Sequence, residues 1–528
     1  MESSFKPKLD SNYSYYVLSV LLVVYIFNFL DRQIIAILAN DIREDLGISL
    51  SDLGFLYGTA FAIFYSIVGI PLAKLADTWH RNYLISGGVA IWSLMTAASG
   101  LMRSFVGLAI CRIGVGIGES SASPAAYSLL SDYFSTNVKT TVYSIYSSGI
   151  YIGGGIGIFL GGWIADSWNN IYPIAEQAPF QLAGWQIAFI SVGLPGLLIA
   201  LLVLTIKEPI RGHSEGIKIE KEERPFFEAG KVLSGILPIS SLVSLLYKKE
   251  KSTEIYYQIF MTFGVISLVA IMSYLTGDLL QWGAFGLGLF TLLSWIQTVK
   301  LNDPIAFSLG FKSKTIIFSM IGFPLISFMG YAVSAFLPAY FIETFEVTKT
   351  VAGRNLGLQS AIFGFFGLLT GGLFSDYLRK KYLNGRIYVG IFAVVTSPIS
   401  IILALQSKDL FTFYVFHIIW SYVSTLWVGL CVATVTDMVL PRMRAMISAF
   451  WILMASVVGL SLGPYSIGKL ADYFISLDYS SANSISYSIQ IWCSVFIISL
   501  IALTLAAKYL PEEENSKVER ARLLGEQI

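Results

Sequence analysis

YIFNFLDRQIIAILA (Tyr25–Ala39) carries Asp31 and Arg32 in the middle of an otherwise apolar run. With its N-terminal flank the run begins at Tyr15, so it is long enough to cross a bilayer as one helix and too long for the apolar core of a cleavable signal peptide. A charge at the bilayer centre costs at least about 2.5–3.5 kcal/mol. The stretch therefore predicts a membrane-spanning helix whose two charges face protein groups rather than lipid.

Composition places the whole chain in the same class. Of its 528 residues 13% are charged, and the mean hydropathy is +0.68. Soluble domains carry about 25% charged residues, so the composition is typical of an all-α polytopic membrane protein. The net charge of +1 gives no indication of nucleic-acid binding, the three cysteines lack metal or disulfide spacing, and no G-x-x-x-x-G-K-[ST] loop is present. We expect no metal, cofactor or nucleic-acid partner.

Apolar runs predict two sets of six spans. The first set lies near 15–38, 53–76, 83–101, 105–131, 140–165 and 185–206, and the second near 314–342, 355–375, 387–405, 411–436, 443–470 and 486–508. Two further apolar runs, near 255–275 and 279–299, bring the expected total to about fourteen. A 16-residue run from Val232 to Tyr247 contains a proline and is short for a span, so we expect one helix lying in the membrane interface.

These runs predict four parts of the chain. Residues 1–206 form an N-terminal six-helix bundle, and 207–312 form a cytoplasmic linker with the interfacial helix and the two extra spans. Residues 313–510 form a C-terminal six-helix bundle, and 511–528 a cytoplasmic tail.

Lysine and arginine in the loops indicate the orientation of the spans. The loops 77–82 and 376–386 and the stretch 207–251 contain these residues, whereas the alternating loops 166–184 and 472–485 contain none. We therefore expect both termini in the cytoplasm. The Lys- and Ile-rich composition is typical of a protein of a bacterial inner membrane.

The pattern [GA]-x-x-x-D recurs at the ends of four predicted helices. The copies are AKLAD (73–77), GWIAD (162–166), GLFSD (372–376) and GKLAD (468–472). The first and third copies are offset by 299 residues (73 to 372), and the second and fourth by 306 (162 to 468). At the offset of 306, Gly153 and Gly157 also fall on Gly459 and Gly463. This register indicates a duplicated six-helix unit, which commonly places a substrate site between its halves.

Each copy alone is equally consistent with a small residue at a helix contact followed by an interfacial carboxylate. Gly149, Gly153, Gly157 and Gly161 lie four residues apart on one face of the fifth helix. We interpret this face as a surface for close helix packing and assign it no role in substrate binding.

Four formal charges lie within the predicted helices away from their ends: Asp31 and Arg32 on the first, and Arg112 and Glu119 on the fourth. Arg112 and Glu119 share a face about 10 Å apart along the axis, whereas Asp31 and Arg32 point about 100° apart. We expect Asp31 to face Arg112. Arg32 would then point elsewhere, towards an anionic substrate whose carboxylate or phosphate its fork can hold in two places.

Low dielectric favours the neutral form of a carboxyl, so Glu119 is a candidate proton carrier. His417, within the second set of helices, is a candidate second proton site, although a lone histidine in a span is more often bonded to its neighbours and inert. The alternative for the charged cluster is a static set of salt bridges that fixes the first helix on the fourth. The two interpretations are compatible, because breaking such a cluster is how it would switch.

Three stretches resemble one family. CRIGVGIGESSASPAAYSLLSDYF (111–134) resembles the helix-4 pattern of the major facilitator superfamily, with the Glu119 and Pro124 of its spinster-like branch. NFLDR (28–32) is similar to the helix-1 motif of that branch, and GWQIAFISVGLPGLLIALLVLTIKEPIRG (184–212) to its sixth helix. Organic anion–cation symporters of the superfamily share a similar helix-1 Asp-Arg and helix-4 Gly-Glu.

The resemblance implies a rocker-switch carrier with a cavity lined by helices 1, 4, 7 and 10, and with Asp31, Arg112 and Glu119 in proton coupling or gating. Spinster-like members carry lysolipids and sphingoid phosphates. The residues expected to bind such a substrate are Arg32, Ser120, Ser123, Tyr331, Tyr340, His417 and Trp420. Packing or lipid contact is an equal alternative for each aromatic residue. The expected partners are this substrate, protons and membrane lipids, and the expected state is a monomer.

The loop between helices 2 and 3 reads AKLADTWHRN, where the superfamily ordinarily has G-x-L-x-D-R-x-G-R-K. We expect Asp77 and Arg81 here, and Asp376 and Arg379 in the second copy, to form the gating contacts between the halves. Efflux members favour Gly-Pro on helix 5, where this chain has Gly157-Ile158, so the direction of transport stays open. Spinster-like proteins ordinarily have twelve helices, and peripheral packing or assembly is the expected role of the extra pair.

Three alternatives to a carrier of amphipathic anions remain. A symporter of small organic anions is expected to have a positively charged cavity, whereas the four buried charges here sum to zero. An intramembrane enzyme finds weak support, because GESSA (118–122) fails G-x-S-x-G at its last position. A carrier-fold receptor that binds without transporting is compatible with the sequence, although two retained gating loops speak against it.

Overall fold

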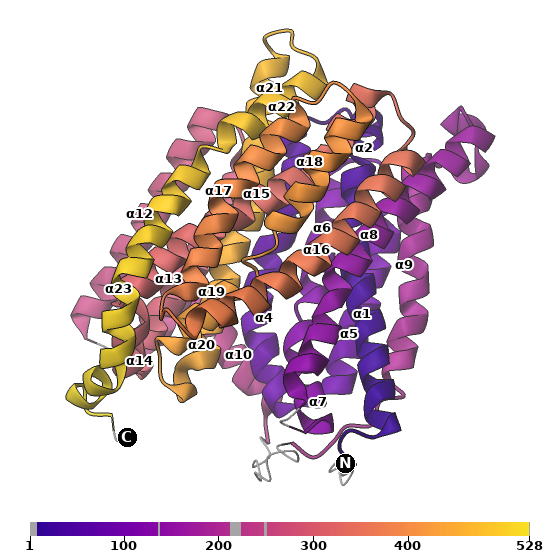
Figure 1. Cartoon of the computed structure of the whole chain (residues 1–528). Helices are drawn as coiled ribbons and strands as arrows, with labels where there is room; N and C mark the ends of the chain where they lie inside the picture. The colour runs from indigo at the N-terminus through magenta and orange to yellow at the C-terminus, as the bar shows by residue number, and fades with distance from the viewer. Residues whose placement is uncertain (1–7, 136–137, 212–222, 248–250, 527–528) are drawn as a thin grey trace. The chain divides into compact units, whose positions relative to one another are not determined.

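The computed structural model describes residues 8–135, 138–211, 223–247 and 251–526, and the regular elements within these ranges are helices (Figure 1). The basic stretch 207–251 is therefore described only in part, because 212–222 and 248–250 lie outside the described residues. The expected all-α class is confirmed.

The helices follow the predicted spans in order. The first set comprises α1 (Asn12–Ile37), α3 (Leu50–Gly54) with the π-helical turn η1 (Phe55–Thr59) and α4 (Ala60–Thr78), α5 (Arg81–Ser99), α6 (Phe105–Glu119) with α7 (Ala122–Tyr133), α8 (Lys139–Ile171) and α9 (Gly184–Val203). A short helix, α2 (Ala39–Leu46), follows α1.

The second set comprises α15 (Lys314–Phe345), α16 (Lys349–Arg379), α17 (Gly385–Leu405), α18 (Leu410–Val423) with α19 (Leu430–Asp437), α20 (Arg444–Met454) with the π-helical turn η6 (Ala455–Ser461) and α21 (Leu462–Ile475), and α22 (Ser481–Trp492) with α23 (Val495–Leu523). Between the sets lie α10 (Pro225–Ile236), α11 (Ser240–Tyr247), α12 (Ser252–Thr276), α13 (Leu279–Asn302) and α14 (Pro304–Phe311).

Helices thus stand at the fourteen predicted span positions, but the count of fourteen is approximate. Among the described residues twelve helices are long and apolar enough to cross a membrane, or 13 if the bent α10–α11 pair forms one span. The positions that fall short are α5, which begins with the polar Arg81 and Asn82, and α18, which has 14 residues.

The single interfacial helix predicted from Val232 to Tyr247 is wrong. The chain forms α10 and α11, which are bent by 102° relative to each other. Pro238 lies at the break and has no N–H to donate, and Ile239 has the left-handed φ of 65°. A continuous helix cannot pass through this pair of residues.

The chain folds into two compact units. Unit 1 comprises Met1–Ile48, Phe64–Leu233 and Glu346–Ala361, and unit 2 comprises Ser49–Ile63, Ser234–Phe345 and Ile362–Ile528. Each unit therefore takes the start of one helix from the other half of the sequence, namely α16 in unit 1 and α3 with η1 in unit 2. These boundaries differ from the predicted domain boundaries, and α23 continues beyond residue 510 into the predicted tail. The division into two six-helix bundles stays a prediction.

The glycine register marks equivalent contacts in the two units. In unit 1, a Cβ on Gly157 would lie 2.6 Å from the carbonyl oxygen of Leu30 on α1. In unit 2, a Cβ on Gly463 would lie 2.3 Å from the carbonyl oxygen of Phe328 on α15. The close packing expected of the glycine face is thereby confirmed, because α8 can lie this near to α1 only without a side chain.

Two of the four [GA]-x-x-x-D copies cap the start of another helix. Asp166 accepts hydrogen bonds from the Thr350 N–H and hydroxyl, both at 2.7 Å, at the start of α16. Asp472 accepts from the Leu50 and Ser51 N–H groups, both at 2.8 Å, at the start of α3. A helix start leaves unpaired N–H groups with partial positive charge, which a carboxylate satisfies.

The glycine of each capping motif allows the backbones to touch. A Cβ on Gly162 would lie 2.5 Å from the Lys349 carbonyl oxygen, and one on Gly468 would lie 2.3 Å from that of Leu50. The other two copies differ: Gly372 has nothing within 4 Å of such a Cβ, and Asp77 and Asp376 are exposed. The motif is therefore a capping device at two places and a loop feature at the other two.

This difference yields a matched pair of substitutions. Gly468→Ala is expected to lower stability by about 1–3 kcal/mol, because its new methyl group meets backbone that cannot turn aside. Gly372→Ala has open space and is expected to leave stability unchanged or raise it by up to about 1 kcal/mol through helix propensity. Thermal unfolding of the purified protein in detergent measures both. Equal shifts for the two variants would contradict the assigned backbone contact.

Candidate functional site

The four charges singled out from the sequence are all buried in unit 1. The exposed fractions are 1% for Asp31, 6% for Arg32, 1% for Arg112 and 0% for Glu119. α1 carries the first pair and α6 the second. No net charge is buried with this set, which limits the desolvation penalty that isolated ions would incur.

Arg32 and Glu119 form an ion pair. The Arg32 Nη2 lies 2.6 Å from the Glu119 Oε2 and 3.5 Å from the Asn28 Oδ1. The guanidinium also lies over the rings of Phe29 and Tyr65, at 4.6 and 5.5 Å from their centroids. The expectation that Arg32 points away from the cluster is therefore wrong in this structure. Its fork is engaged by the Glu119 carboxylate on α6 and by two aromatic faces.

The surroundings of Asp31 differ from those of Arg32. The groups close enough to act on its carboxyl include Glu119, Thr96 and Arg112. Arg112 is thus among the electrostatic neighbours of Asp31, and the expected facing of the two side chains stays a prediction. The two carboxyls also act on each other, so a change in the charge of one alters the energy of the other.

The predicted helix 105–131 is interrupted directly after Glu119. Pro124 has no N–H to donate to the Ser120 carbonyl, and α6 gives way to α7 at this point. The Ser120 hydroxyl donates to the Ile117 carbonyl at 2.7 Å, and the Ser121 hydroxyl to that of Gly118 at 2.8 Å. The hydroxyl proton of Ser120 is therefore used by the backbone. Ser123 is half-buried, and its role in binding stays a prediction.

A cluster of tyrosines that the sequence analysis missed lies beside the charged residues. Tyr25 and Tyr146 stack with ring centroids 4.3 Å apart, and Tyr127 meets Tyr146 edge-on at 5.1 Å. Tyr65, which lies against Arg32, belongs to the same surroundings. These residues come from four separate helices, so no spacing in the sequence connects them.

The residues expected in the second half lie in unit 2. Tyr340 is buried, and its hydroxyl donates to the Leu405 carbonyl at 2.8 Å. His417 is buried, with its ring stacked on Phe413 at 5.9 Å. Trp420 is buried and Tyr331 is half-buried. The bond of Tyr340 to backbone favours a packing role, and substrate binding by the four stays a prediction.

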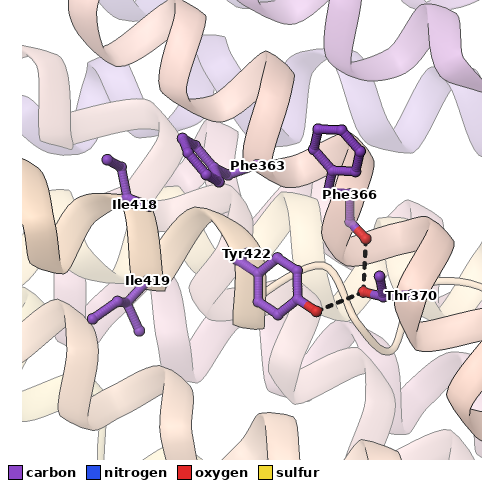
Figure 2. Close-up of a pocket in the computed structure, with 6 residues that line it drawn as sticks. All are labelled: Phe363, Phe366, Thr370, Ile418, Ile419 and Tyr422. Carbon is purple, nitrogen blue, oxygen red and sulfur yellow. Dashed lines mark hydrogen bonds between the residues drawn. The ribbon is translucent and has the colours of Figure 1, made fainter.

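Unit 2 also contains a cavity of about 460 Å³ between α16 and α18 (Figure 2). Its lining residues are Phe363, Phe366, Thr370, Ile418, Ile419 and Tyr422. The two hydroxyls bond to each other at 2.8 Å, and that of Thr370 also donates to the Phe366 carbonyl at 2.7 Å. The polar groups are thus satisfied within the wall, and the cavity presents hydrocarbon. None of the residues predicted to bind substrate is among these lining residues.

The predicted gating residue Arg81 is buried in an ion network. It lies 2.7 Å from Asp132 and 2.8 Å from Glu208, and it donates to the Ser128 hydroxyl at 2.8 Å. Asp77, the expected member of the same loop, is exposed. The role of both residues in gating between the halves stays a prediction.

The second half repeats this network in unit 2. Arg379 binds Asp437 and Glu514, and Arg386 binds Asp437 and the exposed Asp376. Glu208 and Glu514 are offset by the same 306 residues as the capping motifs. The offset could be read from the sequence. The ion networks could not, because they join residues that lie too far apart in the chain to form a local pattern.

Comparisons with known proteins agree with the resemblance. The family model described as Major Facilitator Superfamily matches residues 21–464. Protein spinster of Drosophila melanogaster is 23% identical over 517 residues, which cover 96% of this chain and 70% of that protein. An MFS-type efflux pump of Mycolicibacterium smegmatis is 23% identical over 454 residues, covering 86% of this chain and 83% of the pump.

A solved structure gives the same result for the fold. The crystal structure of a bacterial homologue of the human lysosomal transporter spinster, inward-facing and unoccupied, matches with a TM-score of 0.67 at 22% sequence identity. The match covers 97% of this chain and 99% of that chain.

The buried ion pair predicts non-additive effects on stability. Arg32→Met leaves Glu119 buried without its guanidinium, and we expect a loss of about 3–5 kcal/mol. The double variant Arg32→Met/Glu119→Leu is expected to lose less than the two single variants together, because no uncompensated charge remains. Thermal unfolding in detergent gives the coupling.

An exposed pair serves as the control. Lys231→Met removes the partner of Glu228 in a salt bridge of 2.6 Å whose lysine side chain is 57% exposed, and its effect should stay within about 1 kcal/mol. Strictly additive losses at Arg32 and Glu119 would show that the two side chains are not coupled.

Proposed function

The chain belongs to the major facilitator superfamily of transporters and resembles its spinster branch, and from this premise we propose that it carries amphipathic anions or zwitterions by proton-coupled alternating access. The observation that carries the proposal is the buried pair of Arg32 and Glu119. The substrate class proposed is that of lysolipids and sphingoid phosphates. We further propose that the protein acts as a monomer in a bacterial inner membrane with both termini in the cytoplasm.

The ion pair supplies a way to couple a proton to an anion. While Glu119 is ionised, it occupies the Arg32 fork at 2.6 Å. A proton on Glu119 removes the negative charge that holds the guanidinium there. The freed fork can then bind a carboxylate or phosphate in two places. On this proposal the arrangement in the structure is the deprotonated state, in which Arg32 is withheld from the substrate.

Asp31 and Arg112 extend the same mechanism. Because the carboxyls of Asp31 and Glu119 act on each other, a proton that neutralises Glu119 makes the ionised form of Asp31 less costly. Arg112 then retains an anionic neighbour while Arg32 changes partner. The net charge of the cluster rises by one on protonation, which favours entry of an anion.

The apolar cavity of unit 2 supports an amphipathic substrate. Its hydroxyls are bonded to each other, so no donor or acceptor remains to hold a polar ligand, whereas a hydrocarbon chain loses no hydrogen bonds there. The charged cluster of unit 1 offers the opposite chemistry. Unit 1 thus contains ionic chemistry suited to a charged head, and unit 2 separately contains an apolar surface suited to a hydrocarbon tail.

The runner-up function is a proton-coupled symporter of small organic anions. It shares the proton-dependent release of Arg32 but makes no use of the apolar cavity between α16 and α18. A static ion pair that fixes α1 on α6 is the competing interpretation of the charges, and it implies no proton flux.

Substrate-evoked proton flux in proteoliposomes with an internal pH dye tests the proposal. The panel contains a lysophospholipid, a sphingoid phosphate and several small organic anions. We expect flux with the lipid class in the native protein and its loss in Glu119→Gln. The exposed carboxylate Glu176 provides the matched control Glu176→Gln, which should retain the flux. Flux that remains in Glu119→Gln at the level of protein-free vesicles reports leak caused by detergent-like lipids.

The other results of the flux assay distinguish the alternative functions. Flux with small anions alone would favour the runner-up. Flux that persists in Glu119→Gln would leave Glu119 as a structural partner of Arg32. Absence of flux with every substrate would contradict proton coupling.

A further inference from the structure

The inserted hairpin contacts the π-helical turns of unit 2 through α13, whereas α12 packs on α13 and α11. Its first helix, α12, is largely exposed, with 11% of its most apolar window buried, whereas the corresponding value for α13 is 50%. α13 lies against the π-helical turns η1 and η6. A purely peripheral role would predict a generic apolar contact here, but the contact is polar and specific.

Gln281 joins α13 to η1 through Thr59, which also contacts η6. The Thr59 hydroxyl on η1 lies 2.7 Å from the Gln281 side-chain oxygen and 2.9 Å from the Ser461 carbonyl on η6. The Thr59 and Ser461 hydroxyls are 3.0 Å apart. All three residues are buried, so these bonds cannot be exchanged for bonds to water without opening the contact.

Asp278 joins the start of α13 to α21. Its carboxylate lies 2.8 Å from the Lys469 Nζ and accepts a hydrogen bond from the Tyr465 hydroxyl at 2.6 Å. The Trp282 ring packs edge-on against that of Tyr465, with centroids 5.7 Å apart. α13 therefore holds η1 through Gln281 and α21 through Asp278.

These two elements meet at a backbone crossing, which we call the α3–α21 crossing. A Cβ on Gly54 would lie 2.6 Å from the Pro464 carbonyl oxygen, and one on Gly58 would lie 2.2 Å from that of Leu460. The crossing ends at the cap that Asp472 provides for α3.

Unit 1 contains a copy of this contact, the α8–α16 crossing. A Cβ on Gly353 would lie 2.6 Å from the Ile158 carbonyl oxygen, and one on Gly357 would lie 2.6 Å from that of Gly155. Gly353 and Gly357 follow Gly54 and Gly58 by 299 residues. The two crossings are thus equivalent in backbone and in cap.

The side chains that bind α13 break this equivalence. At the offset of 306, Tyr465 and Lys469 correspond to Phe159 and Trp163, and at the offset of 299 Thr59 corresponds to Leu358. Trp163 and Leu358 are 50% and 56% exposed. Polar side chains therefore replace apolar ones at the positions where the inserted helix binds.

We propose that Asp278 and Gln281 are positioning residues that hold α3 and η1 on α21, so that the α3–α21 crossing separates less readily than the α8–α16 crossing. If the α3–α21 crossing separates, α13 must lose its bond either to η1 through Gln281 or to α21 through Asp278. Its consequence for transport rests on the alternating access proposed above. The difference between the crossings is a property of the resting protein and needs no substrate for its measurement.

Amide hydrogen exchange of the full chain in lipid nanodiscs tests the proposal, with peptides covering 49–59 and 348–358 and rates normalised to the intrinsic rate of each amide. We expect slower exchange in 49–59 than in 348–358 in the native protein. Gln281→Leu should accelerate exchange in 49–59 by about five-fold, which corresponds to the loss of one buried hydrogen bond, and leave 348–358 unchanged.

Gln297→Leu is the matched control. Gln297 is also a buried glutamine of α13, but its amide donates to the Glu254 carbonyl at 2.9 Å within the hairpin, and its loss should not alter either crossing. Asp278→Asn is the second variant should Gln281→Leu fail to fold, with acceleration expected in the same peptide. Equal native rates in the two segments would overturn the proposal, as would an equal effect of Gln281→Leu and Gln297→Leu or none from Gln281→Leu.

Proteoliposome flux provides a separate readout. A changed maximal rate with an unchanged half-saturating substrate concentration is expected for Gln281→Leu, because Gln281 is not a member of the charged cluster proposed to bind the substrate. A protein that shows no flux at all still reports the exchange difference, so failure of the proposed function and failure of the brace are distinguishable.

Discussion

The fold depends on helices that touch backbone to backbone. Within hydrocarbon there is no hydrophobic force to press one helix on another, so close packing has to supply the attraction. Glycine permits such packing at Gly153 against α1 and at Gly463 against α15, where any side chain would meet a carbonyl oxygen. Close approach also brings helix starts within reach of Asp166 and Asp472, whose carboxylates satisfy N–H groups that lipid cannot.

The charged cluster depends on the cancellation of buried charges. Four ions within unit 1 would be untenable singly, and they are tolerated because their charges cancel and because Arg32 has both a carboxylate and aromatic faces around it. Desolvation raises the free-energy cost of breaking the Arg32–Glu119 pair. It also makes the pair sensitive to a change in the charge of either side chain. On the mechanism proposed above, a single proton on Glu119 changes the balance between attraction and desolvation, so that one interaction serves both stability and the proposed switch.

The sequence was sufficient to predict those features that depend on a single helix. The positions of the spans, the glycine register and the burial of the charges all follow from hydropathy and helical period. The partner of Arg32 did not, because residue spacing gives the direction of a side chain on its own helix but not the rotation of the neighbouring helix. The break after Glu119 had a local signal in Pro124, whereas the tyrosine cluster and the apolar cavity combine residues from separate helices.

The two halves of the sequence share features of the backbone and differ in the chemistry of their side chains. Asp132 and Asp437 hold equivalent places in the two ion networks, an offset of 305 residues, and at that offset His417 stands where Arg112 does and Ser424 where Glu119 does. Both helices lose regularity just there, at 120–121 and at 424–429.

The second half thus keeps the interruption of the helix and lacks the ions beside it. An interruption that exposes backbone carbonyls can serve polar recognition or simply allow a bend. In unit 1 the interruption lies beside Arg112 and Glu119, which suits polar recognition. In unit 2 the interruption has no such charges and borders the apolar cavity between α16 and α18. The brace of α13 adds a third asymmetry on the same frame, at polar positions that the first half fills with apolar side chains.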